Sequence, residues 1–386
     1  MTAWAVTTAA DGIEFDTQQA LFCSCRQIDS NHFINFWSGV DYDGYVQVFT
    51  VNTTTWAVTT ANDPLEFDTT NGQYNSCFAI DSNHFINFWS SDGADGYVQV
   101  FTVNTSTWAV TTANNALEFD TVNGTYNSCF QIDSNHFINF WSGSGSDGYV
   151  QVFTVNTSTW AVTTAKNALE FDTQTGFWNS CYQIDSNHFI NFWSGFSDRR
   201  LFAQVFTVNT TTWAVTTASD PLNLGGSYTA GPTTSRVDSN HFVVFFEAAA
   251  GLVQTLTINT STWAVTTANT SLNYSASIGG YNSCFAIDSN HFINFWSGSG
   301  SDGYVQVFTV NTSTWAVTTA NNALEFDTLN GMYNSCFQID SNHFINFWSG
   351  DGSDGYVQVF TVELPGAGPS FLSAWARNSN SILKVM

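Results

Sequence analysis

The stretch at residues 126–160, YNSCFQIDSNHFINFWSGSGSDGYVQVFTVNTSTW, decides the fold because near-copies of it recur along the whole chain. The tryptophan of its WAVTT segment returns every 52 residues, with one step of 53 and one of 50. It falls at Trp4, Trp56, Trp108, Trp160, Trp213, Trp263 and Trp315. The histidine of the DSNHF segment falls at His32, His84, His136, His188, His241, His291 and His343. Seven copies at a period of this size are typical of the blades of a β-propeller.

Each copy contains four runs with the composition of β-strands. The runs are CFQI, HFINFWSG, GYVQVFTV and WAVTT, which are rich in β-branched and aromatic residues and are bounded by Gly, Asn, Asp and Ser. No window shows a sustained apolar period of 3.6 residues, so we expect almost no helix. Three of the connections are short, and the fourth, from WAVTT to the cysteine run, is long. The long one fits a chain that returns inward to begin the next blade, so CFQI is the inner strand and WAVTT the outer one.

The two ends of the repeat region complement each other. The chain begins with an outer strand at residues 3–8 and finishes its last copy with a third strand at residues 356–362. Pairing the two would complete blade seven and cover an open sheet edge. We therefore predict an all-β fold: a seven-bladed propeller over residues 1–362, with four antiparallel strands per blade. Residues 363–386 are predicted to be a linker and a C-terminal tail.

Composition restricts the classes of partner. Seven Lys and Arg against 31 Asp and Glu give a net charge of −24. Such a surface repels phosphate backbones and anionic lipids, which argues against nucleic-acid and membrane partners. No apolar run is long enough to span a bilayer, and a strand follows Met1 almost at once, where a signal peptide would lie. We expect a monomeric ring that is cytoplasmic, or that belongs to a virion or to a longer cell-surface protein.

The seven cysteines are predicted to be free thiols, most of them buried. Six of them occupy one position of the inner strand, seven residues before the histidine, where blade five has Thr234. Equivalent positions in neighbouring blades should lie farther apart than the roughly 7 Å that a disulfide allows between Cα atoms. A ring of metal ligands is the alternative, but the chain has no CxxC motif and the ring would be wide for one ion.

Variation between the copies points to one face of the ring. Differences in length within the repeat are confined to the loop between the second and third strands, and binding usually resides in variable loops. Strand direction places these loops on the same face as the long connections. Positive charge gathers there too, with Arg199 and Arg200 in the blade-four loop, which makes both residues candidate ligand contacts. We predict that this face carries the function.

Two repeated polar motifs allow a chemical and a structural interpretation. The DSNH segment contains the residue types of a Ser/His/Asp catalytic set, but seven copies favour a hairpin turn stabilised by Asp and Asn side chains. The SDG-type loops resemble calcium loops, with Asp41, Asp43, Asp92 and Asp95 as the best candidate ligands. Asp-Gly is also the usual turn signal before a strand, and we favour the turn. No cofactor is predicted.

Six tryptophans that end the second strand beside the variable loop are the candidate ligand-binding residues. They are Trp37, Trp89, Trp141, Trp193, Trp296 and Trp348. Aromatic faces beside Asp, Asn and Ser provide the stacking surface and polar groups that bind sugars. The alternative is that these large side chains pack between blades, as every propeller requires.

The IDSNHFINFW segment resembles the "LDSTHFVVAY" repeats of highly repetitive bacterial and phage-associated propeller proteins. The resemblance covers about twelve residues of each unit, including VDSNHFVVFF in blade five. It implies the fold and assigns no activity.

These observations favour a non-enzymatic recognition propeller that binds glycan multivalently on the variable-loop face. The alternative is a structural building block of a virion, filament or large surface protein, with another surface or virion protein as its partner. An enzyme with one site over the central channel is the third hypothesis, and it would need unique polar residues that converge there.

Overall fold

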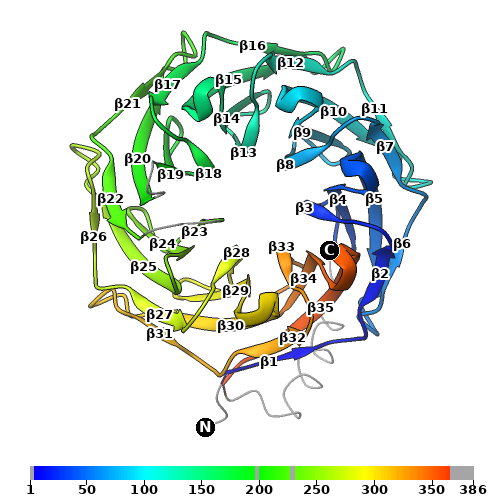
Figure 1. Ribbon diagram of the computed structural model, residues 1–386, viewed down its shortest axis with the longest axis vertical. Coiled ribbons are helices and arrows are strands. Elements are labelled where there is room, and N and C mark those ends of the chain that lie inside the picture. The colour runs from blue at the N-terminus through cyan, green and yellow to red at the C-terminus, as the bar shows by residue number, and fades with distance from the viewer. Residues whose placement is uncertain (1–3, 196–199, 227–230, 366–386) are drawn as a thin grey trace, which may run out of the picture.

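The computed structural model describes residues 4–195, 200–226 and 231–365, which form seven β-sheets arranged in a ring around a central channel (Figure 1). Each sheet is one blade. Its strands follow one another in order from the channel to the rim, and neighbouring strands are antiparallel. The prediction of an all-β, seven-bladed propeller is confirmed. Only short 3₁₀ turns interrupt the strands of the described residues, at Val40–Tyr42, Asp92–Ala94, Ser144–Ser146, Ser299–Ser301 and Asp351–Ser353.

The inner strands of blades one to seven are β3 (Leu21–Gln27), β8 (Gln73–Ala79), β13 (Thr125–Gln131), β18 (Phe177–Gln183), β23 (Thr233–Arg236), β28 (Gly280–Ala286) and β33 (Met332–Gln338). The second strands are β4 (His32–Ser38), β9 (His84–Ser90), β14 (His136–Ser142), β19 (His188–Gly195), β24 (His241–Glu247), β29 (His291–Ser297) and β34 (His343–Ser349). The third strands are β5 (Gly44–Val51), β10 (Gly96–Val103), β15 (Gly148–Val155), β20 (Arg200–Val208), β25 (Gly251–Ile258), β30 (Gly303–Val310) and β35 (Gly355–Glu363).

Two short strands share the outer edge of each blade. The WAVTT segments form β6 (Val58–Thr60), β11 (Val110–Thr112), β16 (Val162–Thr164), β21 (Val215–Thr217), β26 (Val265–Thr267), β31 (Val317–Thr319) and, for blade seven, β1 (Ala5–Thr8). A further strand follows each of them: β7 (Leu65–Asp68), β12 (Leu117–Asp120), β17 (Leu169–Asp172), β22 (Leu222–Gly225), β27 (Leu272–Ser275), β32 (Leu324–Asp327) and β2 (Ile13–Asp16). In blade one, β6 pairs with one end of β5 and β7 pairs with the other end.

The additional outer strand extends the prediction of four strands per blade. The sequence analysis treated this segment as part of a long connection. Its alternation explains the strand, because Leu65 and Phe67 pack against the core between blades one and two while Glu66 is exposed. Phe67 lies against Gly44, where an added Cβ would come within 2.5 Å of the phenyl ring.

The N-terminal strand closes the ring as predicted. β1 pairs with β35 in a register that joins Ala5 to Glu363 and Thr8 to Phe360. The next strand, β2, pairs with the other end of β35. The final sheet therefore combines the first and last described parts of the chain (Figure 1). The predicted tail lies, from residue 366 onward, outside the described residues.

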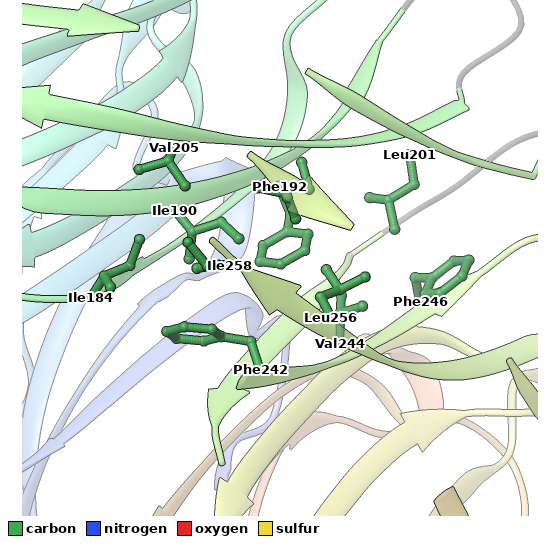
Figure 2. Packing of buried hydrophobic residues seen from close by; sticks show 12 residues of the cluster. Ile184, Ile190, Phe192, Leu201, Val205, Phe242, Val244, Phe246, Leu256 and Ile258 are labelled. Atoms are coloured by element: carbon green, nitrogen blue, oxygen red, sulfur yellow. The ribbon is translucent and has the colours of Figure 1, made fainter. Parts of the chain in front are cut away.

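The hydrophobic core is divided into seven layers, one between each pair of neighbouring blades. Figure 2 shows the layer between blades four and five, where Ile190 and Phe192 of β19 face Phe242, Val244 and Phe246 of β24. A second strand has a neighbouring blade on each of its faces, so its apolar residues run almost without a break instead of alternating.

Candidate functional site: the central channel

The inner strands alternate between two environments. In blade two, Tyr74, Ser76 and Phe78 line the channel. Cys77 is buried between them and bonds to the neighbouring blade. Each inner strand begins on the face that carries the loops between second and third strands, which we call the loop face. It ends on the face that carries the Asp-Ser-Asn turns, which we call the turn face.

An aromatic ring surrounds the channel near the loop face, formed by the residue three positions before each cysteine of the repeat. Its members are Phe22, Tyr74, Tyr126, Trp178, Tyr281 and Tyr333. Neighbouring centroids lie 4.3–4.6 Å apart along most of the ring, with planes tilted by 46–58°. At such short spacing the neighbouring side chains are in direct contact, so the ring is stabilised by aromatic pairs between blades.

All six residues of this aromatic ring adopt left-handed backbone conformations, with φ between 50° and 55°. A residue with a side chain is disfavoured there by about 1–2 kcal/mol, so packing around the channel must hold the six bulges in place. In blade five the equivalent residue is Gly231, and Trp178 and Tyr281 meet across it at 5.8 Å. Blade five therefore contributes no side chain to the aromatic ring, and the contact that closes the ring there is longer than the others.

A layer of asparagines lies beside the aromatic ring and is fixed by hydrogen bonds. In blade two, Asn75 Nδ2 donates to the Gly72 carbonyl at 2.7 Å, and its Oδ1 accepts from Asn87 Nδ2 at 2.8 Å. Asn87 is fully buried, and its own Oδ1 has no hydrogen-bond partner among the described residues. The same arrangement recurs in blades three, four, six and seven.

Serine and cysteine side chains connect the blades around the channel. The Cys77 amide donates to Ser24 Oγ at 3.0 Å, and Cys77 Sγ donates to the Ser24 carbonyl at 3.2 Å. At blade five the link changes, because Thr234 Oγ1 donates within its own blade to the Val243 carbonyl at 3.0 Å. All seven cysteines are free and five are buried, as predicted. Burial raises the pKa of the Cys25 thiol to about 12, which suits a structural thiol better than a nucleophile.

A cavity of about 470 Å³ occupies the channel towards the turn face. A second group of channel-facing side chains, which we call the collar, surrounds it one position after the cysteines. Aromatic residues form the collar in five blades: Phe78, Phe130, Tyr182, Phe285 and Phe337. Blade one has Arg26 at this position and blade five has Ser235. The repeat is thus broken at two places that both face this cavity.

Arg26 is held at the cavity wall by two contacts. Its Nη1 donates to the carbonyl of Cys25 at 2.8 Å, and its guanidinium carbon lies 5.1 Å from the centre of the Phe78 ring. Every ion pair recorded among the described residues joins a histidine to an aspartate. The Arg26 guanidinium has no carboxylate partner within that part of the chain.

The DSNH segment is structural, and the turn interpretation is supported. Asp81 Oδ1 accepts from the amides of Asn83 and His84, and His84 Nδ1 lies 2.9 Å from the same carboxylate. The His84 ring stacks on Trp160 of the next blade at 3.6 Å. Six such stacks link the blades, and at the seventh junction Trp4 contacts His291 with its ring tilted by 37°.

The six predicted ligand-binding tryptophans lie in the interior, where they pack between blades as the alternative interpretation expected. Trp37, Trp89, Trp141, Trp193, Trp296 and Trp348 are only 1–3% exposed. Trp89 shows why: its ring packs against Phe67 of the preceding blade, and its Nε1 donates to Asp68 Oδ2 at 2.7 Å. The same bond to an aspartate forms at Trp37, Trp141, Trp193 and Trp348. These side chains serve the junctions between blades.

The remaining predicted residues do not converge into one site. Arg200 is exposed at the start of β20, and Arg199 lies outside the described residues. Asp41 and Asp92 belong to the 3₁₀ turns of two different blades. Asp43 and Asp95 directly follow these turns, and the pKa of Glu66 is raised by slight burial and by the neighbouring Asp43 carboxylate. The described residues contain no group of three or more His, Cys, Asp or Glu arranged to hold a metal ion.

The channel-facing residues were not predicted from the sequence, although the sequence contains a signal for them. Aligning the copies on the cysteine shows aromatic residues at the third position before it and the first position after it. The exceptions, Arg26, Gly231 and Ser235, fall in blades one and five. The left-handed backbone before the cysteine could not be anticipated, because tyrosine and tryptophan are unusual there.

Comparison with known proteins adds the fold and no family. No family model and no curated protein matches the chain. A periplasmic gluconolactonase from Pseudomonas aeruginosa is similar in structure, with a TM-score of 0.59 and 12% identity over 89% of this chain and 95% of that one. Sqt1 from Saccharomyces cerevisiae is similar with a TM-score of 0.55 and 9% identity, over 93% of this chain and 99% of that one. Sqt1 from Chaetomium thermophilum, bound to the N-terminus of ribosomal protein L10, is similar with a TM-score of 0.53 and 12% identity, over 92% of this chain and 100% of that one. Within the described residues, no helix has the length and apolarity to cross a membrane.

Proposed function

We propose that this protein is a non-enzymatic binding propeller that takes one ligand in its central channel. The observation that carries the proposal is where the repeat loses its regularity. The residues that join the blades are nearly uniform around the ring, whereas the collar carries Arg26 and Ser235 in place of aromatic side chains. Single deviations in a concave cavity that combines aromatic and polar side chains are what a specific ligand site requires.

The proposal differs from multivalent binding on the loop face. Sites formed once per blade would give several ligands per molecule, and the buried tryptophans provide no stacking surface for them. An axial site gives one ligand per molecule. A sugar remains a candidate ligand in this form of the proposal, because the aromatic ring and the asparagine amides supply apolar and polar contacts near the loop face.

A protein partner is the second candidate, favoured by the structural neighbour Sqt1 from Chaetomium thermophilum, which is bound to the N-terminus of a ribosomal protein. The channel mouth at either face would accept a chain terminus more readily than a folded surface. The two candidates are distinguished by the probe and not by the location of the site.

The test uses a glycan array and ligand-detected NMR with a fragment library on the full chain. Ser235→Phe copies the residue that blade six has at this position and should fill part of the cavity. We expect saturable 1:1 binding that Ser235→Phe abolishes and that Glu66→Ala, a change on the exposed rim, leaves intact. Several ligands per chain, or binding that is indifferent to Ser235→Phe, would contradict the proposal.

A further inference from the structure

We propose that the turn-face cavity binds the carboxylate of a small organic acid through Arg26, with the apolar part of the ligand against the aromatic collar. This inference rests on the proposed function, since it names the ligand class of the same channel. The chain is strongly acidic, so an anion site inside it has to be created locally by a placed cation.

The position of Arg26 is the first argument. Its side chain lines the cavity, with the guanidinium held between the Cys25 carbonyl of its own blade and the Phe78 ring of the next blade. The guanidinium is therefore within reach of a ligand that occupies the cavity.

The unused hydrogen-bonding capacity of Arg26 is the second argument. A guanidinium has five N–H donors, and the one recorded hydrogen bond from this side chain goes to the Cys25 carbonyl. The stack on Phe78 fixes the plane of the group without consuming its other donors. A carboxylate matches this planar arrangement with two parallel hydrogen bonds.

The fold does not need a cation at this position, which is the third argument. Five other blades place Phe or Tyr there and close equivalent sheets around the channel. Holding a half-buried cation at the cavity wall carries a desolvation penalty that an aromatic residue avoids. An anionic ligand would remove this penalty by pairing with the guanidinium.

The apolar collar and the size of the cavity limit the ligand. Phe78 and Phe130 lie with ring centroids 5.1 Å apart, and Phe130 and Tyr182 are 5.3 Å apart. A flat or aliphatic body can rest on these rings while its carboxylate reaches Arg26. About 470 Å³ accommodates a small organic acid and excludes a folded partner.

The experiment is isothermal titration of the full chain with benzoate, and with benzamide as the neutral molecule of the same shape. We expect benzoate to bind 1:1, and benzamide to bind about 10- to 100-fold more weakly, as expected for loss of a charge-assisted pair. Arg26→Gln should weaken benzoate binding by a similar factor, and Arg26→Lys should weaken it less because a point charge remains.

Lys166→Gln is the matched control, because it removes one positive charge from an exposed connection. The hydrogen bond that Lys166 accepts from Gln151 Nε2 goes to its backbone carbonyl, so the substitution leaves it in place. It should leave benzoate binding unchanged. Circular dichroism of each variant verifies folding. Absence of saturable benzoate binding, or equal affinity in wild type and Arg26→Gln, would overturn the inference.

The outcomes separate this inference from the proposed function. If neutral fragments bind and Ser235→Phe abolishes their binding while Arg26→Gln has no effect, the channel is the ligand site and the anion inference fails. If binding is indifferent to both substitutions, the channel is not the site and both proposals fail.

Discussion

The histidine of the repeat occupies a junction between two blades. His84 lies 2.9 Å from Asp81 within its own turn and stacks on Trp160 of the next blade. Trp160 holds a left-handed conformation, φ 58°, which the tight turn before it imposes. A stacked aromatic pair contributes about 0.5–1.5 kcal/mol, enough to offset much of that backbone cost.

The carboxylate in this arrangement predicts a response to acid. Slight burial opposes ionisation of Asp81, but the amides of Asn83 and His84 and the His84 ring outweigh it and lower the pKa of the carboxyl. A group whose pKa is lower in the folded state stabilises the fold above its unfolded pKa, near 3.9, and loses that contribution as the pH falls through the folded pKa. Asp81→Asn should therefore be less stable than wild type at pH 7, and the difference should shrink towards pH 2. Urea unfolding at both pH values measures it, and a constant difference would contradict the assignment.

A second residue-scale prediction concerns the indole N–H of the buried tryptophans. Trp89 donates to Asp68, whereas blade five supplies Ser275 at the equivalent position, and the buried Trp296 Nε1 has no partner among the described residues. Asp68→Ser should destabilise the protein by about 1–3 kcal/mol, since it leaves a buried donor unpaired.

Ser275→Asp is the reciprocal variant, because it offers Trp296 the acceptor that other tryptophans have. It should raise the free energy of unfolding by about 1 kcal/mol. Thermal and chemical unfolding of both variants provide the measurement. Opposite signs for the two substitutions are expected, and a loss of stability in both would show that the bond does not determine the effect.

At the scale of the strand, the outer edge shows what a single sequence can and cannot reveal. The period of 52 residues and the β-type runs were sufficient for the number of blades, their strand order and the closure by residues 3–8. The second outer strand was missed because LEFD is only four residues long and follows a turn-like segment. For the buried tryptophans, ligand stacking and packing between blades both stayed open, because local sequence does not show that Asp68 of the preceding blade lies beside Trp89.

The missed strand predicts an asymmetry between neighbouring substitutions. Phe67 packs into the core layer between blades one and two, and Glu66 is exposed on the opposite side of β7. Phe67→Ala should cost about 3 kcal/mol through the lost contacts and the space left beside Gly44, and Glu66→Ala should change stability by less than about 0.5 kcal/mol. Guanidinium unfolding measures both. A loose connection instead of a strand would make the two substitutions similar.

At the scale of the molecule, the ring is held by junctions that are repeated around the channel, and one of them depends on the start of the chain. β1 supplies an outer strand to the sheet of β35, and Val6 enters the core layer between blades six and seven. Trp4 also packs against the His291 ring of blade six, with centroids 4.3 Å apart and planes tilted by 37°. Loss of this strand would leave an edge of β35 unpaired. It would also weaken the junction between blades six and seven, because Val6 would be missing from that core layer.

Deletion of residues 1–8 should therefore lower the midpoint of thermal unfolding and promote self-association through the exposed edge of β35, whose residues Phe360–Glu363 pair with β1 in the intact protein. Size-exclusion chromatography and thermal unfolding measure the two effects. A synthetic peptide with the sequence of residues 2–9, added in excess, should restore both by rebuilding the strand pairing, while the same peptide with Val6→Asp should not, because Val6 is buried. A truncated chain that remains monomeric with an unchanged midpoint would mean that the other six blades close the ring without β1.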